Sequence, residues 1–324
     1  MATHTSRAFW VAAPGRGEIR EETMAAPGAD EVVVRSLYSG ISRGTEALVF
    51  NGRVPPGEYQ RMRAPFQSGE FPAPVKYGYA SVGRVEQGPP ELRDRAVFVL
   101  YPHQTRYIVP ARAVYVLPDN VPPARAVLAA NLETAINGVW DAAPLLGDRI
   151  VVVGAGTVGC LAAWLAGRLL DCEVELVDTN PQRAAIAREL GVQFTAPGRV
   201  SENADVVIHA SGSAAGLALA LRAAAFEATV VELSWYGNQA VPVALGEEFH
   251  ARRLTLKSSQ VGSVARAQRP RWDVRRRMQL ALTLLRHAEL DAMITGESEF
   301  DALPEVMARI STAPGDTLCH RIRY

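Results

Sequence analysis

Short apolar runs dominate the first third of the chain. They are separated by glycine and proline, and none of them continues with the 3.6-residue recurrence of a helix. Runs of this length, rich in valine and aromatic residues, predict β-strands. The pattern therefore predicts a compact β-rich unit, barrel-like or sandwich-like, with no helix of convincing length. The expected strands are residues 8–13, 31–37, 80–87, 96–100, 105–110 and 114–118.

The pattern changes at Val121, where apolar residues begin to recur with a helical period. Residues 122–142 start with proline and consist mostly of helix-forming residues, so they predict a helix that leads into a second unit. Beyond Arg149, strand and helix patterns alternate, and the strands are nearly continuous apolar runs. Such strands are typical of a parallel sheet covered by helices on both faces, which predicts a doubly wound α/β domain.

The elements of this second unit can be placed from the same pattern. The expected strands are residues 149–154, 173–178, 205–210, 228–234 and 252–259, with helices at residues 157–170, 181–191 and 215–225. Two more helices, residues 278–295 and 300–310, and a closing strand, residues 318–324, follow. Periodicity alone does not say to which sheet the closing strand belongs.

Length and composition narrow the class of protein. The chain has 324 residues, more than one hydrophobic core usually supports, so two domains are expected. Its 34 basic and 34 acidic residues balance, which predicts no attraction to nucleic acid or to an anionic membrane. The three cysteines form no CxxC or metal pattern, and no stretch reaches the about 18 apolar residues of a membrane span. We therefore expect a soluble cytoplasmic protein with a small-molecule substrate.

One basic segment departs from this balance. Residues 266–278 carry six arginines in the sequence RAQRPRWDVRRRM. A loop that enters a solvated helix face is the simpler interpretation, and a site for an anionic substrate or partner is the alternative.

A glycine-rich loop follows the first strand of the second unit. Gly154, Gly156 and Gly159 form GxGxxG between that strand and a predicted helix. The first glycine allows a tight turn, the second lets the backbone approach a pyrophosphate, and the third lets helix and strand pack closely. The phosphates are expected at the helix N-terminus, at Thr157 and Val158, where free N–H groups and the helix dipole favour negative charge.

An acidic residue strengthens the dinucleotide interpretation. Asp178 ends the next strand, 19 residues after Gly159, where a carboxylate accepts both ribose hydroxyls of an adenosine. The same carboxylate repels a 2′-phosphate, and Thr179 and Asn180, rather than an arginine, follow it. The sequence therefore favours NAD over NADP as the cofactor.

Taken together, the β-rich first part, the linking helix, the GxGxxG unit and the C-terminal segment resemble the medium-chain dehydrogenase/reductase superfamily of alcohol dehydrogenase type. The resemblance covers essentially the whole chain. It implies the α/β fold class, with a GroES-like β-rich catalytic domain formed by residues 1–120 and 290–324 and a Rossmann domain formed by residues 121–289. A homodimer is common in that superfamily and is expected here.

Zinc-dependent members of the superfamily carry a GICGTD-like turn and a GHE motif. Residues 39–46, SGISRGTE, look like the first, and residues 77–85, YGYASVGRV, look like the second. The cysteine position holds Ser42, or Arg43 if the one-residue insertion is placed differently, and the GHE positions hold Tyr79 and Ala80.

The remaining metal-ligand positions are also depleted. Near residues 129–133 only Glu133 could coordinate a metal, and the four-cysteine lobe of the family is absent from the sequence. A catalytic zinc needs three protein ligands, so we expect a member that binds no zinc.

Without a metal, charge on a reacting oxygen must be stabilised by hydrogen-bond donors. Tyr79 is the first candidate, because its phenol replaces a metal-ligand position, although a tyrosine that is satisfied by local packing is the alternative. Ser42 and Thr45 either relay a proton or cap a turn. By the resemblance, Glu46 pairs with a basic group beneath the pocket.

The resemblance also implies cofactor contacts outside the glycine loop. It places Thr134 against the nicotinamide and the strand end Ser211-Gly212 along the dinucleotide, in keeping with the rule that ligands bind at the carboxyl ends of parallel strands. His209 is expected to be a packed residue or one at the ribose edge. Lys76 and His103 are able to act as acid or base, but the sequence does not place them.

Three functions remain open at this point. The first is a zinc-independent, NAD(H)-dependent oxidoreductase that transfers a hydride to or from an alcohol or carbonyl carbon, with a bulky or ring-bearing substrate suggested by the resemblance of SGISRGTE to the active-site turn of bacteriochlorophyllide dehydrogenases. The second is a C=C reductase of the enone or quinone type. The third is a dinucleotide-binding sensor that has lost its catalytic groups.

Overall fold

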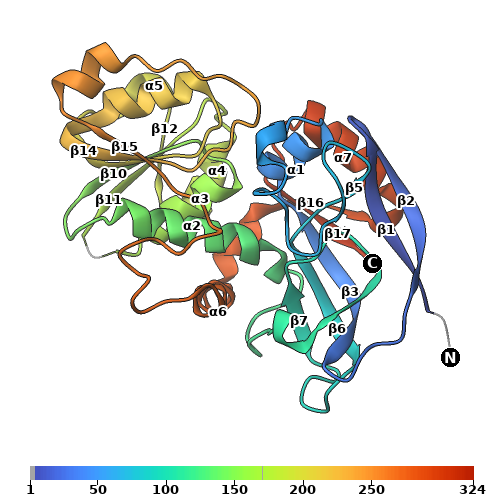
Figure 1. The fold of residues 1–324 in the computed structure, drawn as a ribbon. Helices are drawn as coiled ribbons and strands as arrows, with labels where there is room; N and C mark the ends of the chain where they lie inside the picture. Colours follow the sequence, from blue (N-terminus) through green and yellow to red (C-terminus); the bar gives the residue numbers. More distant parts are fainter. Residues whose placement is uncertain (1–3, 170) are drawn as a thin grey trace. The chain divides into compact units, whose positions relative to one another are not determined.

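A computed structural model describes residues 4–169 and 171–324. The chain divides into two compact units (Figure 1): unit 1 comprises Met1–Ala130 and Leu282–Tyr324, and unit 2 comprises Asn131–Ala281. Each unit has its own sheet system and is described separately.

Unit 1 is built on two sheets, and the chain's C-terminal segment completes the larger one. The seven-stranded sheet has the order β16-β17-β3-β6-β7-β9, with β8 pairing with β3, and the smaller sheet has the order β2-β1-β5-β4. Two helices, α1 (Arg43–Phe50) and α7 (Leu303–Thr312), belong to this unit. The strands are β1 (His4–Ala13), β2 (Arg16–Met24), β3 (Glu31–Ile41), β4 (Ser68–Gly69), β5 (Val75–Lys76), β6 (Ser81–Gln87), β7 (Ala96–Val99), β8 (Arg106–Pro110), β9 (Tyr115–Val116), β16 (Ile294–Glu299) and β17 (Cys319–Arg323).

The core of unit 1 comes from the valine-rich strands that the sequence pattern identified. Val32 and Val34 of β3 pack with Val85 of β6 and Val97 of β7 in one buried cluster. Residues two apart on a strand point to the same face, so the alternation within the strand selects this core.

The sequence prediction missed α1, β2, β4, β5 and β16 of unit 1, and the helix expected over residues 278–295 ends at Leu284. Residues 43–50 form α1, although no helix was expected here, and β2 was not predicted at all. The first turn of α1 is polar, and β2 has the sequence RGEIREETM, an edge strand whose side chains are mostly exposed or half-buried. β2 has no alternating buried apolar face, and the buried residues of α1, which are Glu46, Val49 and Phe50, span little more than one turn, too short for a period to be visible.

Unit 2 contains a six-stranded parallel sheet with the order β12-β11-β10-β13-β14-β15. Helices lie on both faces of this sheet (Figure 1), as expected for a doubly wound domain. The short strand β12 was not predicted. The strands are β10 (Arg149–Val153), β11 (Glu173–Val177), β12 (Gln193–Thr195), β13 (Ala204–His209), β14 (Ala224–Glu232) and β15 (Thr255–Ser258). The helices are α2 (Ala129–Ala142), which begins at the end of unit 1, α3 (Thr157–Ala166), α4 (Arg183–Glu189), α5 (Ala214–Ala223) and α6 (Val274–Leu284).

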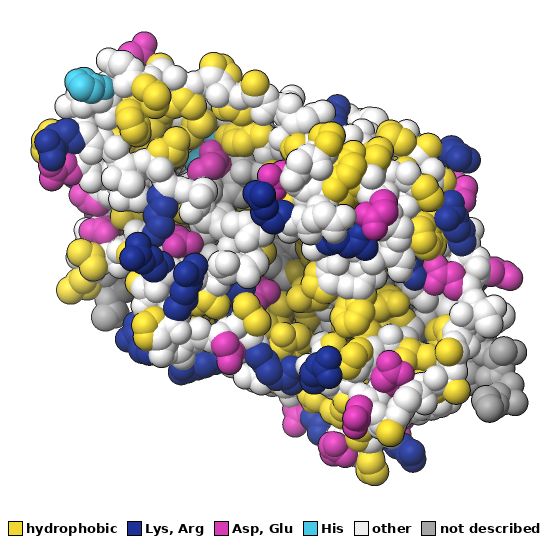
Figure 2. Space-filling view, viewed as in Figure 1, with side chains coloured by type: hydrophobic (Ala, Val, Ile, Leu, Met, Phe, Trp, Pro, Cys, Tyr) yellow, Lys and Arg dark blue, Asp and Glu magenta, His cyan; other side chains and the backbone are white. Residues whose placement is uncertain are grey.

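The predicted fold class is confirmed: a β-rich unit accompanies a doubly wound parallel one. The predicted helix over residues 157–170 ends at Ala166, and its last residue lies outside the described part of the chain. On the face drawn in Figure 2, basic and acidic side chains are interspersed. Among the residues that the structure describes, no helix has the length and apolar character needed to cross a bilayer.

Candidate functional site

The glycine loop of unit 2 depends on backbone contacts that a side chain would prevent. Gly154 follows β10 with a φ of 107°, and a Cβ at this position would lie 2.5 Å from the Ser211 backbone nitrogen. A Cβ at Gly159 would overlap the Gly154 carbonyl oxygen. The loop can therefore close against the turn after β13 only because both positions lack a side chain.

The loop leads into the N-terminus of α3. Gly156 is the N-cap residue, and Thr157 and Val158, both half-buried, form the start of the first turn. The first N–H groups of a helix have no acceptor within it, and together with the helix dipole they attract anions. This cradle fits the pyrophosphate of a dinucleotide.

Asp178, at the end of β11, is held beside this cradle. Its Oδ2 accepts a hydrogen bond from the Ala155 N–H at 2.7 Å, and its Oδ1 accepts one from the Asn180 N–H at 2.8 Å. The carboxylate is half-buried and oriented by both bonds. Because each oxygen can accept more than one hydrogen bond, the carboxylate can still accept ribose hydroxyls.

The strand ends of the parallel sheet gather most of the predicted cofactor residues. Ser211 and Gly212 follow β13, next to the glycine loop that follows β10, and the Gly212 N–H donates to Ser234 Oγ at 3.0 Å. Thr134 lies half-buried on α2 rather than at this edge. The residues that meet at the edge are Gly154, Gly156, Thr157, Val158, Gly159, Asp178, Ser211 and Gly212.

In unit 1 the last residue of the SGISRGTE segment, Glu46, is a buried carboxylate that pairs with a histidine. Glu46 Oε2 lies 2.8 Å from His103 Nε2, and both side chains are almost completely buried. The other carboxylate oxygen of Glu46 accepts the Ser42 N–H at 2.7 Å. On the far side of the ring, Nδ1 lies 2.7 Å from Ser39 Oγ, which in turn lies 2.9 Å from the Tyr324 hydroxyl.

Tyr79 approaches the same carboxylate from the other predicted motif. Its phenol is hydrogen-bonded to the side chains of Ser42 and Thr45. Burial, together with the charge of Glu46, raises the pKa of Tyr79 to about 12, although the two hydroxyl contacts offset part of the rise. The phenol therefore keeps its proton near neutral pH and acts as a hydrogen-bond donor. Figure 1 shows α1, on which Thr45 and Glu46 lie.

The structure thus brings all four predicted catalytic residues of unit 1 together, and it adds three more. His103 was recognised as a possible acid or base but not placed, and Ser39 and Tyr324 were not considered. These residues come from the segment after β7, from β3 and from the residue after β17, so no local spacing relates them. Lys76, the other unplaced group, is buried and donates instead to Glu22 and Gln104.

Glu133, the remaining carboxylate at a family metal position, is engaged elsewhere. Arg277 Nε donates to Glu133 Oε1 at 3.1 Å, and both side chains are buried. Burial raises the pKa of Glu133, and Arg277 offsets part of this rise. Arg277 belongs to the basic segment for which a solvated face was the simpler interpretation, so that interpretation is wrong for this residue, whose side chain is only 1% exposed. Within the described ranges, no three His, Cys, Asp or Glu side chains are grouped to hold a metal ion.

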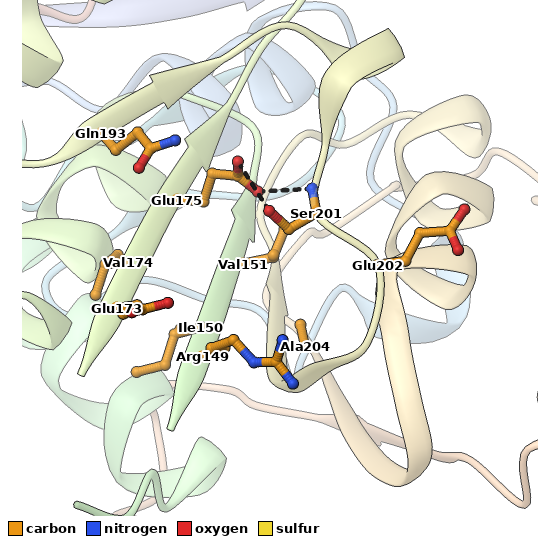
Figure 3. A pocket seen from close by; sticks show the side chains of 10 residues that line it. All are labelled: Arg149, Ile150, Val151, Glu173, Val174, Glu175, Gln193, Ser201, Glu202 and Ala204. Atoms are coloured by element: carbon orange, nitrogen blue, oxygen red, sulfur yellow. Dashed lines mark hydrogen bonds between the residues drawn. The ribbon is translucent and has the colours of Figure 1, made fainter. Parts of the chain in front are cut away.

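A small cavity of about 60 Å³ lies at the amino-terminal edge of the unit 2 sheet, opposite the edge that holds the glycine loop (Figure 3). It is bordered by Arg149 and Glu173, the first residues of β10 and β11. Glu175 accepts hydrogen bonds from the Thr195 hydroxyl and from the N–H and hydroxyl of Ser201. The carboxylate is thus satisfied within the protein, and the cavity is far smaller than a ligand pocket.

Comparison with known proteins agrees with the fold. No family model matches the chain. A D-guloside 3-dehydrogenase of Escherichia coli is 28% identical over 295 residues, which is 81% of this chain and 83% of that protein.

Solved structures match over almost the full length. A zinc-dehydrogenase-like protein of Sinorhizobium meliloti 1021, bound to NADP, superposes with a TM-score of 0.78 at 18% identity, covering 99% of this chain and all of the other. An alcohol dehydrogenase of Escherichia coli CFT073, complexed with NADH, gives a TM-score of 0.78 at 15% identity and covers 99% of both chains. The relatives and the solved structures that match are alcohol and polyol dehydrogenases of the medium-chain dehydrogenase/reductase superfamily, and this likeness supports an NAD(P)-dependent oxidoreductase.

Proposed function

We propose that this protein is a zinc-independent oxidoreductase that transfers a hydride between NAD(H) and the carbon of an alcohol or carbonyl group. The observation that carries the proposal is the position of Tyr79. Its phenol is held by two hydroxyl side chains beside the buried Glu46–His103 pair, at a motif position where zinc-dependent relatives have a ligand.

The residues of unit 2 fit the cofactor. The N-terminus of α3 and the glycine loop would hold the pyrophosphate, Asp178 the adenosine ribose and Thr134 the nicotinamide, while the Ser211-Gly212 turn would line the dinucleotide. When bound, the dinucleotide supplies or accepts the hydride. NAD is favoured over NADP because the Asp178 carboxylate lies where a 2′-phosphate would be placed.

Tyr79 supplies the proton in carbonyl reduction. Its O–H donates a hydrogen bond to the substrate oxygen and gives up the proton as that oxygen becomes an alkoxide. An alkoxide is more basic than a phenolate, even one whose pKa is raised to about 12, so the transfer is favourable. Solvent water then returns a proton to the phenolate through the Ser42 or Thr45 hydroxyl, which gives up one proton and accepts another in the same step.

The side chains at the family's metal positions do not form a zinc donor set. Ser42 and Tyr79 offer hydroxyl groups, which are not among the usual zinc ligands. The other ionisable groups are already in pairs, Glu46 with His103 and Glu133 with Arg277. We therefore propose that hydrogen-bond donation by Tyr79 takes the part that a Lewis acid has in zinc-dependent relatives.

A row of aromatic rings leads to Tyr79 and supports a ring-bearing substrate. The Tyr59 and Phe71 rings are 5.6 Å apart, Phe71 and Tyr77 5.7 Å, and Tyr77 and Tyr79 5.9 Å. Phe71 and Tyr77 are buried, so the half-buried rings at the two ends of the row, Tyr59 and Tyr79, are those that can pack against the flat or C–H-rich face of a cyclic substrate. The name of the D-guloside 3-dehydrogenase relative points to a ring hydroxyl as the reacting group.

The test is a screen of NADH-dependent reduction and NAD-dependent oxidation with glycosides, cyclic alcohols, ketones, enones and chlorin substrates. For the substrate that turns over, Tyr79→Phe is expected to lower kcat by about 10² to 10³, the usual effect of losing one such donor. NADH affinity, measured by fluorescence, should stay unchanged, and the aromatic control Tyr59→Phe should retain its activity. Equal turnover in Tyr79→Phe removes this residue from the mechanism.

Metal analysis provides a separate test of zinc independence. Purified protein is expected to hold no stoichiometric zinc and to keep its activity after dialysis against a chelator. One tightly bound zinc per chain, lost together with the activity, contradicts the proposal.

A further inference from the structure

The carboxyl edge of the unit 2 sheet holds a second histidine that is bonded on both sides. His209 and Glu232 are the last residues of β13 and β14, and they lie opposite each other in the strand register. His209 Nδ1 is 2.6 Å from Glu232 Oε2, and His209 Nε2 is 2.6 Å from Ser211 Oγ. A carboxylate, an imidazole and a hydroxyl therefore lie in line, in the order that activates a serine nucleophile.

The Glu232 carboxylate determines which ring nitrogen of His209 carries the proton. Glu232 also accepts hydrogen bonds from the Ser234 N–H at 2.7 Å and from the Tyr236 hydroxyl at 2.9 Å. Burial raises the pKa of Glu232, but the hydrogen bond and charge of His209 and the Ser234 contacts outweigh it and leave the pKa below its ordinary value. The ionised carboxylate accepts the Nδ1 proton, which leaves the Nε2 lone pair to accept the Ser211 O–H.

The serine is the accessible member of the set. His209 is completely buried, whereas Ser211 is exposed in the turn that precedes α5. Gly216, in the first turn of α5, makes this arrangement possible: a Cβ there would overlap Ser211 Oγ and lie 2.8 Å from His209 Nε2. The absence of a side chain at this position lets the helix approach a hydroxyl that is already bonded to the imidazole.

The start of α5 also supplies donors for a developing oxyanion. The Ser213 N–H donates to Ser211 Oγ at 3.2 Å, so the backbone at the helix start faces the hydroxyl. Ser213 Oγ caps the helix by accepting the Gly216 N–H at 3.0 Å. The N–H groups of Ala214 and Ala215, which begin the helix, have no acceptor within it and lie at the positive end of its dipole.

We propose that Ser211 is an activated nucleophile and that this edge of unit 2 catalyses acyl transfer from carboxylic esters to water. Ser211 Oγ attacks the ester carbonyl carbon while its proton passes to His209 Nε2. The tetrahedral intermediate, stabilised by the first N–H groups of α5, expels the alcohol, which leaves with that proton. Water then gives a proton to His209 while its oxygen attacks the acyl-serine; the bond to Ser211 Oγ breaks, His209 returns the proton to Ser211 Oγ, and the carboxylic acid is released.

A fluorophosphonate probe tests the nucleophile directly, because it reacts with an activated serine and not with an ordinary one. Incubation of the full-length protein without added nucleotide, followed by peptide mass spectrometry, should place the adduct on Ser211. Ser211→Ala should abolish the labelling and the hydrolysis of p-nitrophenyl acetate. His209→Gln and Glu232→Gln should slow both by about 10² or more.

The chain contains a matched control at the other edge of the same sheet (Figure 3). Ser201 is exposed, and its hydroxyl is bonded directly to the Glu175 carboxylate with no imidazole between them. It should remain unlabelled, and Ser201→Ala should be labelled at Ser211 as fast as the original protein. Circular dichroism and the thermal unfolding transition show that each variant is folded.

Two outcomes overturn the proposal: a protein that binds NADH but takes up no probe at Ser211, or His209→Gln labelled at the original rate. Neither outcome involves hydride transfer. The proposed oxidoreductase function is therefore tested independently.

Discussion

Each unit of this protein contains a serine, a histidine and a glutamate in one hydrogen-bonded line. In unit 1 the line is Ser39–His103–Glu46, with separations of 2.7 and 2.8 Å, and in unit 2 it is Ser211–His209–Glu232, with two separations of 2.6 Å. The side chains and distances are nearly the same. The two lines differ in where the serine lies, since Ser39 is 1% exposed and Ser211 is exposed.

This difference separates a structural use of the set from a reactive one. In unit 1 the serine hydroxyl is also bonded to the Tyr324 hydroxyl, and the whole line is buried. Through Glu46, which accepts the Ser42 N–H, the line stabilises the SGISRGTE segment. In unit 2 the line ends at an exposed oxygen beside a helix N-terminus. The same three residue types therefore indicate a nucleophile only when a substrate can reach the serine.

The largest expected effect concerns stability. His103→Leu leaves the buried Glu46 carboxylate without its imidazole, which should lower the free energy of unfolding by about 3 to 5 kcal/mol. His209→Leu should cost only about 1 to 3 kcal/mol, because Glu232 keeps the Ser234 and Tyr236 donors.

Guanidinium unfolding followed by circular dichroism measures both losses, and the exposed His250→Leu is the neutral control. Equal losses in the two histidine variants would show that the Ser–His–Glu sets of unit 1 and unit 2 contribute equally to the free energy of unfolding.

The next effect concerns the space beside Ser211 Oγ, which exists because Gly216 has no side chain. Gly216→Ala places a methyl group against Ser211 Oγ and should reduce fluorophosphonate labelling by about 10², because the hydroxyl must leave the imidazole. Gly198→Ala, whose Cβ would meet no atom within 4 Å, is the matched control and should label normally. Unchanged labelling in Gly216→Ala would mean that the contact between Ser211 and His209 does not set its reactivity.

The third prediction concerns Asp178, the proposed ribose-binding residue at the carboxyl edge of the unit 2 sheet. Asp178→Ser removes the charge that opposes a 2′-phosphate, so the ratio of kcat/KM for NADPH to that for NADH should rise about tenfold, equivalent to about 1.4 kcal/mol. Steady-state kinetics with both cofactors measures the ratio. An unchanged ratio would remove Asp178 from the discrimination between the two cofactors.

The smallest effect is expected in the pH dependence of kcat for carbonyl reduction, which involves Tyr79 of unit 1. The protonated phenol of Tyr79 is the active form in reduction, and burial raises its pKa to about 12. It therefore stays protonated at pH 10, where an ordinary tyrosine is about half ionised. The kcat for carbonyl reduction should change by less than about twofold between pH 8 and 10 because of this group. A decline with a midpoint near pH 10 would contradict the assignment.

The sequence predicts most of unit 2 because its signals are local. The glycine loop and Asp178 lie within one strand–helix–strand stretch, and the alternating apolar runs identify five of the six parallel strands. The strand that escaped, β12, has only three residues, too few for any period to be visible. The edge at which the cofactor residues meet then follows from the parallel arrangement of the strands.

The buried line of unit 1 could not be predicted in the same way. His103 is 57 residues from Glu46 and 64 from Ser39, and Tyr324 is 285 from Ser39, so only the completed sheet brings them together. In unit 2, His209 and Ser211 are neighbours in sequence, but the partner Glu232 depends on the register between β13 and β14. Motif comparison found Tyr79, Ser42, Thr45 and Glu46 because a family pattern marked their positions.

The position of β17 between β16 and β3 has a consequence for synthesis on the ribosome. Residues 38–41 of β3 pair with residues 320–323 of β17, so this edge has no partner until almost the whole chain has been made. At about 5–20 residues per second, the edge waits for roughly 14 to 56 s, during which unit 2 can emerge and fold. An unpaired strand edge readily joins other chains, so the nascent protein should be most prone to aggregation in this interval and most dependent on chaperones.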